Sequence, residues 1–229
     1  MQALTSMARP SDPTSNPAGV QHPSALHSLT TLVATVLPTV ARSNGVRRGR
    51  GPLAALMRSQ GLCPVFQPIV SLRDGSVYAH EALIRGPHGT HLHMPDALLA
   101  AAAHEDLNFE FENACVIAAL ANWGALHESG RLFVNVSAEV LVKMLNQCGH
   151  EALKAMVREF GVLPRSLVLE ITEYERVTDM DLLATAVRDI RAEGVSLALD
   201  DFGDGRSSLR LWSQLKPEAG LSLWRVMQT

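Results

Sequence analysis

From Pro52 onward, apolar strand-like runs alternate with segments of helical periodicity, and this alternation limits the possible folds more than any other feature of the chain. The later strand-like runs are apolar almost throughout, as in parallel strands that helices cover. Strands and helices that take turns along a chain are typical of a parallel β/α architecture. We therefore expect an α/β fold built on a parallel sheet.

The expected elements follow from apolar periodicity and from turn residues. The segment 94–126 is consistent with one long helix or two short ones. The others are a short helix at 53–60, a hairpin of strands 64–72 and 77–85 with its turn at 73–76, strands 131–137, 166–172 and 196–202, and helices 139–161, 181–194 and 207–215.

Composition separates a leader from a folded region. Residues 1–51 are rich in Pro, Ser, Thr and Ala and hold few large apolar side chains, which predicts a disordered leader. A hydrophobic content of 47% across the chain allows a real core, and a net charge of −3 gives no reason to expect a nucleic acid polymer as partner.

Cysteine usage and hydropathy suggest a compartment. The 3 cysteines form no C-x-x-C pair, which argues against a disulfide framework or a thiolate zinc site and favours a reducing environment. No run reaches the roughly 18 apolar residues that a membrane helix needs. We expect a soluble, cytoplasmic protein with no membrane span.

Strand-like runs end on residues with side-chain oxygen atoms. These residues are Glu81, Asn135, Glu170 and the pair Asp200 and Asp201. Each one alone could be an ordinary capping or turn residue. In β/α barrels, however, the carboxyl ends of parallel strands meet on one face, so several such residues would form a cluster there.

A cluster of carboxylate and amide oxygens without thiolates suits Mg²⁺ or Mn²⁺ better than zinc. Without a cation, carboxylates so close together would raise one another's pKa at an energetic cost. Two metal ions that share a bridging carboxylate are a common device for phosphodiester cleavage. The strand ends therefore predict a two-metal hydrolytic site.

Four motifs carry a family resemblance. They are "FQPIVSLRDGSVYAHEALIRGP", which contains E-x-L-x-R at 81–85, then "FVNVS", "LEITE" and "DDFGDG". In this order and spacing the chain resembles the EAL domain family of bacterial cyclic di-GMP phosphodiesterases, over about Gly61–Glu218. The resemblance implies a TIM-like (β/α) barrel, of which this chain would hold about five of eight parallel strands.

The resemblance also implies roles for individual residues. The reaction would be hydrolysis of one phosphodiester of cyclic di-GMP to the linear dinucleotide. Arg85 would hold a substrate phosphate through its guanidinium group. Gln67 and the backbone of Leu83 would lie along the nucleotide, and Glu173 would brace the loop after strand five, through which a homodimer could couple to activity. Metal ligands would be Glu81, Asn135, Glu170 and Asp200, with Asp201 serving the second metal.

Departures from the family pattern bear on activity. Leu221 stands where the family has a catalytic lysine, and Asp204 and Arg206 replace a threonine and an aromatic residue. We therefore expect a partial EAL domain at 52–218 and a non-matching tail at 219–229, as after a frameshift, a premature stop or a misplaced gene end. The expected consequences are marginal stability, a tendency to aggregate and negligible hydrolysis. The alternative function is a non-catalytic module that binds cyclic di-GMP or another protein.

A second candidate site is the segment "PHGTHLH", with His88, His91 and His93. Imidazoles at this spacing could bind a transition metal. The favoured interpretation is a polar loop after the second strand, because no cysteine or further ligand is near in sequence.

Overall fold

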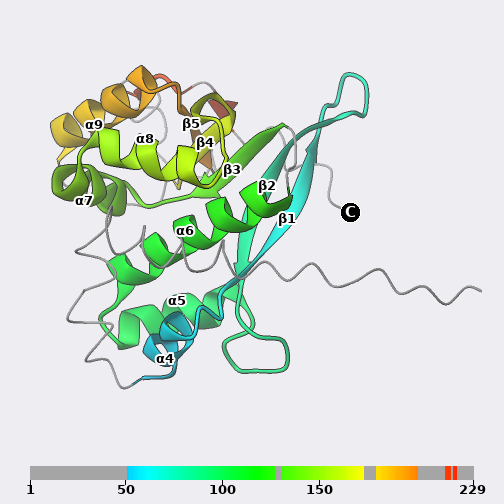
Figure 1. Cartoon of the computed structure of the whole chain (residues 1–229), viewed down its shortest axis with the longest axis vertical. Coiled ribbons are helices and arrows are strands. Elements are labelled where there is room, and N and C mark those ends of the chain that lie inside the picture. Colours follow the sequence, from blue (N-terminus) through cyan, green and yellow to red (C-terminus); the bar gives the residue numbers. More distant parts are fainter. Residues whose placement is uncertain (1–50, 127–129, 173–178, 201–214, 218, 221–229) are drawn as a thin grey trace, which may run out of the picture.

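The computed structural model describes residues 51–126, 130–172, 179–200, 215–217 and 219–220 (Figure 1). Its helices, labelled as in Figure 1, are α4 (Pro52–Arg58), α5 (Pro95–His104), α6 (Asn108–Leu126), α7 (Ala138–Cys148), α8 (His150–Glu159) and α9 (Met180–Ala192), with a 3₁₀ turn at Pro164–Ser166. Its strands are β1 (Cys63–Val70), β2 (Val77–Arg85), β3 (Arg131–Asn135), β4 (Leu167–Thr172), β5 (Ser196–Asp200) and β6 (Ala219–Gly220).

The described strands form one 6-stranded sheet in the order β1-β2-β3-β4-β5-β6. β1 and β2 are antiparallel and form the predicted hairpin, whereas each later strand pairs in parallel with the one before it. Strand order equals chain order, as in a barrel sheet that winds in one direction. The expected β/α fold and partial barrel are confirmed.

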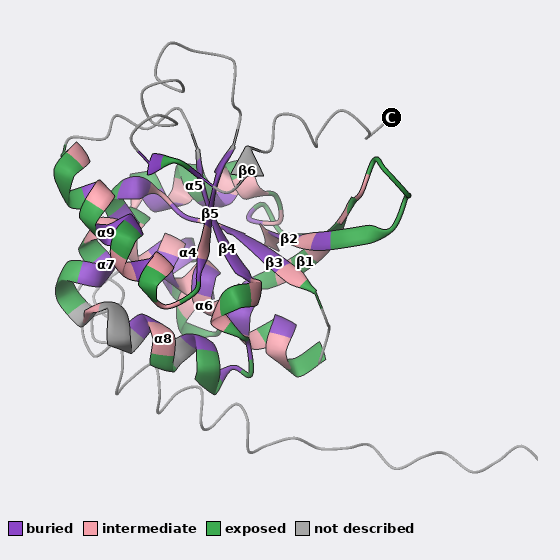
Figure 2. Cartoon of the chain, turned by 90° about the horizontal axis from the view of Figure 1, so that it is seen from above, coloured by how far each residue is buried: buried purple, intermediate pink, exposed green. Residues whose placement is uncertain are grey.

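Helices cover one face of this sheet. The largest apolar cluster joins alternate residues of β3, β4 and β5, such as Val134, Leu169 and Leu197, to buried side chains of α6–α9. A smaller cluster joins α4 and α5 to Phe111 of α6. Figure 1 shows α4 and α5 at one end of the molecule and α7–α9 at the other, with α6 between them. Figure 2 shows β3, β4 and β5 as a mostly buried centre, from which the more exposed hairpin of β1 and β2 projects.

Two helical predictions change in detail. The single helix expected at 139–161 is two helices, because Gly149 has φ 76° and ψ 162°, a conformation that ends α7 and that residues with a Cβ rarely adopt. The open choice at 94–126 resolves into two helices, α5 and α6, with Asp106 at φ 55° between them. Of the helix expected at 207–215, only Leu215 belongs to the described residues.

The two ends of the described sheet differ in character. β6 consists of Ala219 and Gly220, the first residues of the predicted non-matching tail, which pair in parallel with β5. β1 forms the other edge and contains Pro64 and Pro68. Prolines are tolerated in edge strands, where the missing amide donor faces away from the neighbouring strand.

The part of the chain that the structure describes contains no helix that is both long and apolar enough to cross a membrane.

Candidate functional site at the strand ends

The face of the sheet opposite the helices carries an apolar layer. Ala79, Phe133, Val168 and Ala198, one from each of β2 to β5, form a separate buried cluster, and Ile69 of β1 packs against it. In β3, β4 and β5 the residues on either side of these belong to the helix-covered core, since successive side chains alternate between faces. This layer therefore lies on the inner face of the partial barrel.

The predicted oxygen donors lie one step further along the same face. Glu81, Asn135 and Glu170 each follow a residue of the apolar layer by two positions, so they share its face and stand nearer the carboxyl ends of the strands. Glu81 is 8% exposed and Glu170 is 0% exposed. The structure thus brings together three of the predicted donors.

Hydrogen bonds and register fix this arrangement. The Asn135 side-chain amide Nδ2 donates to Glu81 Oε1 over 3.2 Å. Asn135 and Glu170 are partners in the parallel ladder between β3 and β4. The backbone N–H of Val136 donates to the carbonyl of Glu170 over 2.9 Å. The register therefore holds Asn135 level with Glu170, while Glu81, whose ladder partner is Phe133, is joined to Asn135 through the side-chain hydrogen bond.

The structure describes the remaining predicted metal-site residues only in part. Asp200 ends β5 in register with Thr172, which places its backbone at the same edge. The side chain of Asp200, together with Asp201 and Glu173, lies outside the described residues.

The predicted substrate-binding residues stand on the hairpin beside the donors. Gln67 of β1 is the antiparallel partner of Glu81, and Leu83 is the partner of Val65. Arg85 ends β2, is half-buried, and donates from Nη1 to the carbonyl of Ile84 over 2.8 Å. The hairpin thus places Gln67 in register with Glu81, and Arg85 four residues further along β2.

The donor set fits a hard divalent cation. Two carboxylates and an amide oxygen offer only oxygen ligands, the preference of Mg²⁺ and Mn²⁺. A buried carboxylate carries a large desolvation cost that a cation offsets. Glu81, Asn135 and Glu170 are the predicted donors whose side chains the structure describes. Among the described residues, no three His, Cys, Asp or Glu side chains are grouped to hold an ion.

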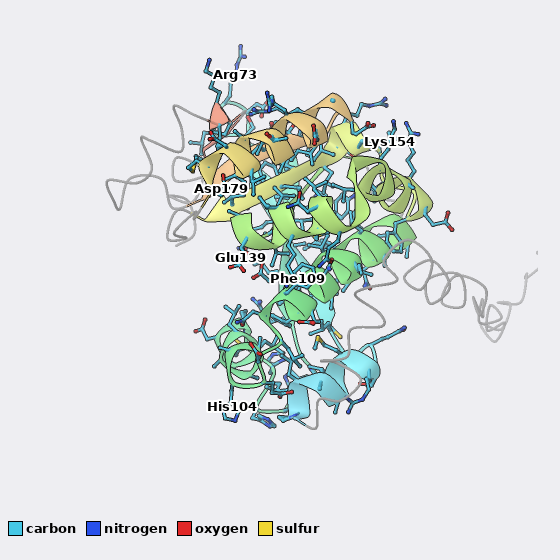
Figure 3. The ribbon with its side chains drawn as sticks, turned by 90° about the vertical axis from the view of Figure 1, so that its left-hand side faces the viewer. Arg73, His104, Phe109, Glu139, Lys154 and Asp179 are labelled. Atoms are coloured by element: carbon cyan, nitrogen blue, oxygen red, sulfur yellow. The ribbon has the colours of Figure 1, made fainter. Side chains whose placement is uncertain are left out.

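Helix starts gather at this edge too. Figure 3 shows Glu139 in the first turn of α7 and Asp179 before α9 on the same side of the molecule, with Lys154 of α8 on the opposite side. In parallel β/α units the helices begin where strands end, so this side is the carboxyl edge of the sheet.

Sequence reasoning missed Glu112 of α6. Its Oε2 accepts the backbone N–H of Ser137 over 2.8 Å. Ser137 caps α7, because its Oγ accepts the N–H of Val140 over 3.2 Å. Burial raises the pKa of the Glu112 carboxyl, and the Ser137 hydrogen bonds offset part of that shift. The serine cap is readable from the sequence, but its partner 25 residues earlier is not.

The histidine segment forms a turn-rich loop after β2. The rings of His88 and His93 meet edge to face with centroids 5.1 Å apart, and His93 Nδ1 lies 3.0 Å from the carbonyl of Gly86. No described acidic, cysteine or histidine side chain joins them as a third ligand. The geometry agrees with the favoured interpretation of a polar loop.

Comparison with known proteins identifies the family. The sequence profile of the EAL domain matches residues 52–221. The chain belongs to the EAL domain family. It is 30% identical over 172 residues to a probable cyclic di-GMP phosphodiesterase, PdeB, of Escherichia coli K12, an alignment that covers 72% of this chain and 32% of PdeB. It is 29% identical over 156 residues to the cyclic di-GMP phosphodiesterase NbdA of Pseudomonas aeruginosa, covering 67% of this chain and 20% of NbdA.

Solved EAL structures share the fold. The manganese/cy-diGMP complex of Klebsiella pneumoniae BlrP1 superposes with a TM-score of 0.60 and 28% identity, covering 73% of this chain and 42% of the BlrP1 chain. Our chain therefore spans a third or less of the two curated relatives and under half of the BlrP1 chain.

Proposed function

We propose that this chain carries the metal-binding and cyclic di-GMP-binding strand ends of an EAL phosphodiesterase. The observation that carries the proposal is the cluster of the buried Glu81 and Glu170 with the partly buried Asn135, in which the amide of Asn135 donates to Glu81. The curated relatives PdeB and NbdA, and the manganese-bound BlrP1 complex with cyclic di-GMP, support the same chemistry.

Some of these residues would bind the metal ions, and others would bind the substrate. Glu81, Asn135, Glu170 and Asp200 would hold one Mg²⁺ or Mn²⁺, and Asp201 would serve a second. Bound cations would supply charge neutralisation at the phosphate and acidification of a water molecule. Arg85 would pair with a phosphate oxygen, and Gln67 would contact the nucleotide beside Glu81. Glu173 would brace the loop that follows its strand.

The apolar layer would assist by excluding water from below. Ala79, Phe133, Val168 and Ala198 close the inner face beneath the carboxylates. An apolar layer that excludes water strengthens the electrostatic interactions of the charged groups beside it.

A non-catalytic role is the second candidate, and Leu221 favours it. Because this leucine occupies the position of the family's catalytic lysine, we expect the chain to bind cyclic di-GMP but to hydrolyse it only very slowly. The chain would then act as a cyclic di-GMP sensor or protein-interaction module.

Calorimetric titration of cyclic di-GMP into the full chain, in Ca²⁺ and separately in Mn²⁺, tests the proposal. We expect metal-dependent binding, which Glu170→Gln weakens by about tenfold or more because one ligand loses its charge. Glu159→Gln, an exposed carboxylate at the end of α8, is the matched control. Absence of binding in both metals, or unchanged binding by Glu170→Gln, contradicts the proposal. Chromatographic detection of the linear dinucleotide in Mn²⁺ separates enzyme from binding module.

A further inference from the structure

Three consecutive residues at the end of β3, 135–137, each form a hydrogen bond with a different element. The side chain of Asn135 donates to Glu81 of β2, the N–H of Val136 donates to the carbonyl of Glu170 in β4, and the N–H of Ser137 donates to Glu112 of α6. The first two contacts come from strands of the site itself. The third comes from a helix on the other face of the sheet.

We propose that Glu112 is a positioning residue that sets the orientation of Asn135 at the metal-binding edge. The proposal rests on the proposed function only for what Asn135 binds. With Ser137 fixed 2.8 Å from the Glu112 carboxylate, the turn between β3 and α7 cannot rotate without breaking that hydrogen bond. A rotation there would carry the Asn135 amide away from Glu81.

The chemistry of Glu112 favours a positional role over simple packing. Its carboxylate is largely withdrawn from water, which is costly for a charged group and raises its pKa. An apolar side chain would fill the same space at lower cost. A charge-assisted hydrogen bond to a backbone N–H gives what an apolar residue lacks, a fixed direction.

Contacts around Glu112 stiffen the same junction. Lys143 of α7 places its Nζ 4.0 Å from the ring centroid of Phe109, three residues before Glu112 on α6. Ser137 in turn caps α7 through its hydroxyl group. Figure 3 shows Phe109 and Glu139 at these two helix starts, on the same side of the molecule. The hydrogen bond of Glu112 therefore joins two helices that are already packed against each other.

The chain offers a matched control in Glu105. Its carboxylate accepts the backbone N–H groups of Leu53 and Ala54 over 2.8 and 2.9 Å, at the start of α4. Glu105 and Glu112 thus both accept backbone N–H groups at the start of a helix, but Glu105 does so at α4, which Figure 1 shows at the opposite end of the molecule from α7.

Proton–nitrogen NMR of the full chain tests the inference through the side-chain amide signals of Asn135. Glu112→Leu, which keeps bulk and removes the acceptor, should shift or broaden these signals in the metal-free protein. It should also weaken Mn²⁺ binding, measured calorimetrically, by about tenfold, as for other residues that orient metal ligands. Glu112→Gln retains an acceptor oxygen and should keep both properties close to wild type. Glu105→Leu should lower the melting temperature and leave both unchanged.

Unchanged Asn135 signals in Glu112→Leu overturn the inference. So do equal effects of the Glu112→Leu and Glu105→Leu variants on those signals, since a general loss of stability then explains both. Where Glu112→Leu does not fold, Glu112→Gln decides, because displaced Asn135 signals in that variant also overturn it. If wild type binds no Mn²⁺, the proposed function fails while the Asn135 signals still test the positioning.

Discussion

At the scale of single residues, Asn113 of α6 is a polar side chain that is fully buried. It is 0% exposed, and neither its amide nitrogen nor its amide oxygen has a hydrogen-bond partner among the described residues. Because a buried polar group without a partner carries its full desolvation cost, we expect Asn113→Leu to raise the free energy of unfolding by about 1 kcal/mol or more. Urea denaturation of both proteins measures the difference. A lower stability for Asn113→Leu than for wild type would show that the amide has a partner.

Two cysteines give a second test at this scale. Cys63 is exposed, whereas Cys115 of α6 is largely shielded. Burial, with a smaller contribution from the nearby Glu112 charge, raises the pKa of the Cys115 thiol, so almost none of it is thiolate at neutral pH. We expect iodoacetamide to modify Cys63 at least about tenfold faster than Cys115 in the native protein. Peptide mass spectrometry gives both rates, and equal rates would contradict the described burial of Cys115.

At the scale of elements, Gly149 divides one periodic stretch into α7 and α8. A Cβ at this position would meet no atom within 4 Å, so the cost of a side chain is conformational only. Because its backbone dihedrals are close to those that only glycine readily adopts, we expect Gly149→Ala to destabilise the protein by about 1–3 kcal/mol. The thermal midpoint measures the loss. Gly75→Ala is the control for a surface turn, because Gly75 lies in the hairpin turn at φ 72° and a Cβ added there would also meet no atom within 4 Å.

Elements also show what local sequence can and cannot predict. The strands were predictable because apolar runs bounded by turn residues need no distant information. The break at Gly149 was not, since the apolar positions keep a helical spacing across it. Glu112 was not predictable either, because its partner Ser137 is 25 residues away and only the packing of α6 beside β3 brings them together. The oxygen donors at the strand ends were predictable from parallel strands alone, and the motif resemblance supplied their proposed roles.

At the scale of the whole molecule, the sheet exposes an edge at β1, and the described strands stop at the two-residue β6. An open sheet leaves backbone donors and acceptors without partners. We therefore expect this chain, as a monomer, to be marginally stable and to associate as its concentration rises. Size-exclusion chromatography across a range of concentrations, together with urea unfolding, measures both properties. A cooperative urea transition of ordinary stability in a strictly monomeric sample would contradict this expectation.

Ligands should act on the whole molecule by mass action. If Mn²⁺ and cyclic di-GMP bind the folded chain and not the unfolded one, each raises its stability according to its concentration relative to its dissociation constant. At about 100 times the dissociation constant the gain is about 2.7 kcal/mol. Thermal melts with and without both ligands measure it, and Glu170→Gln should lose most of the gain. An equal gain in wild type and Glu170→Gln would place binding away from the strand ends.

The prolines of β1 give the sheet a direction of growth. Pro64 and Pro68 are four residues apart, so their nitrogen atoms point toward the same side of the strand, and neither can donate a hydrogen bond. An incoming strand that paired along this edge would find two donors missing, which is how natural sheets discourage addition. Any further strand, whether from this chain or from a second copy, should therefore pair with β6. The hairpin strand β1 should remain an edge strand in any larger sheet that forms.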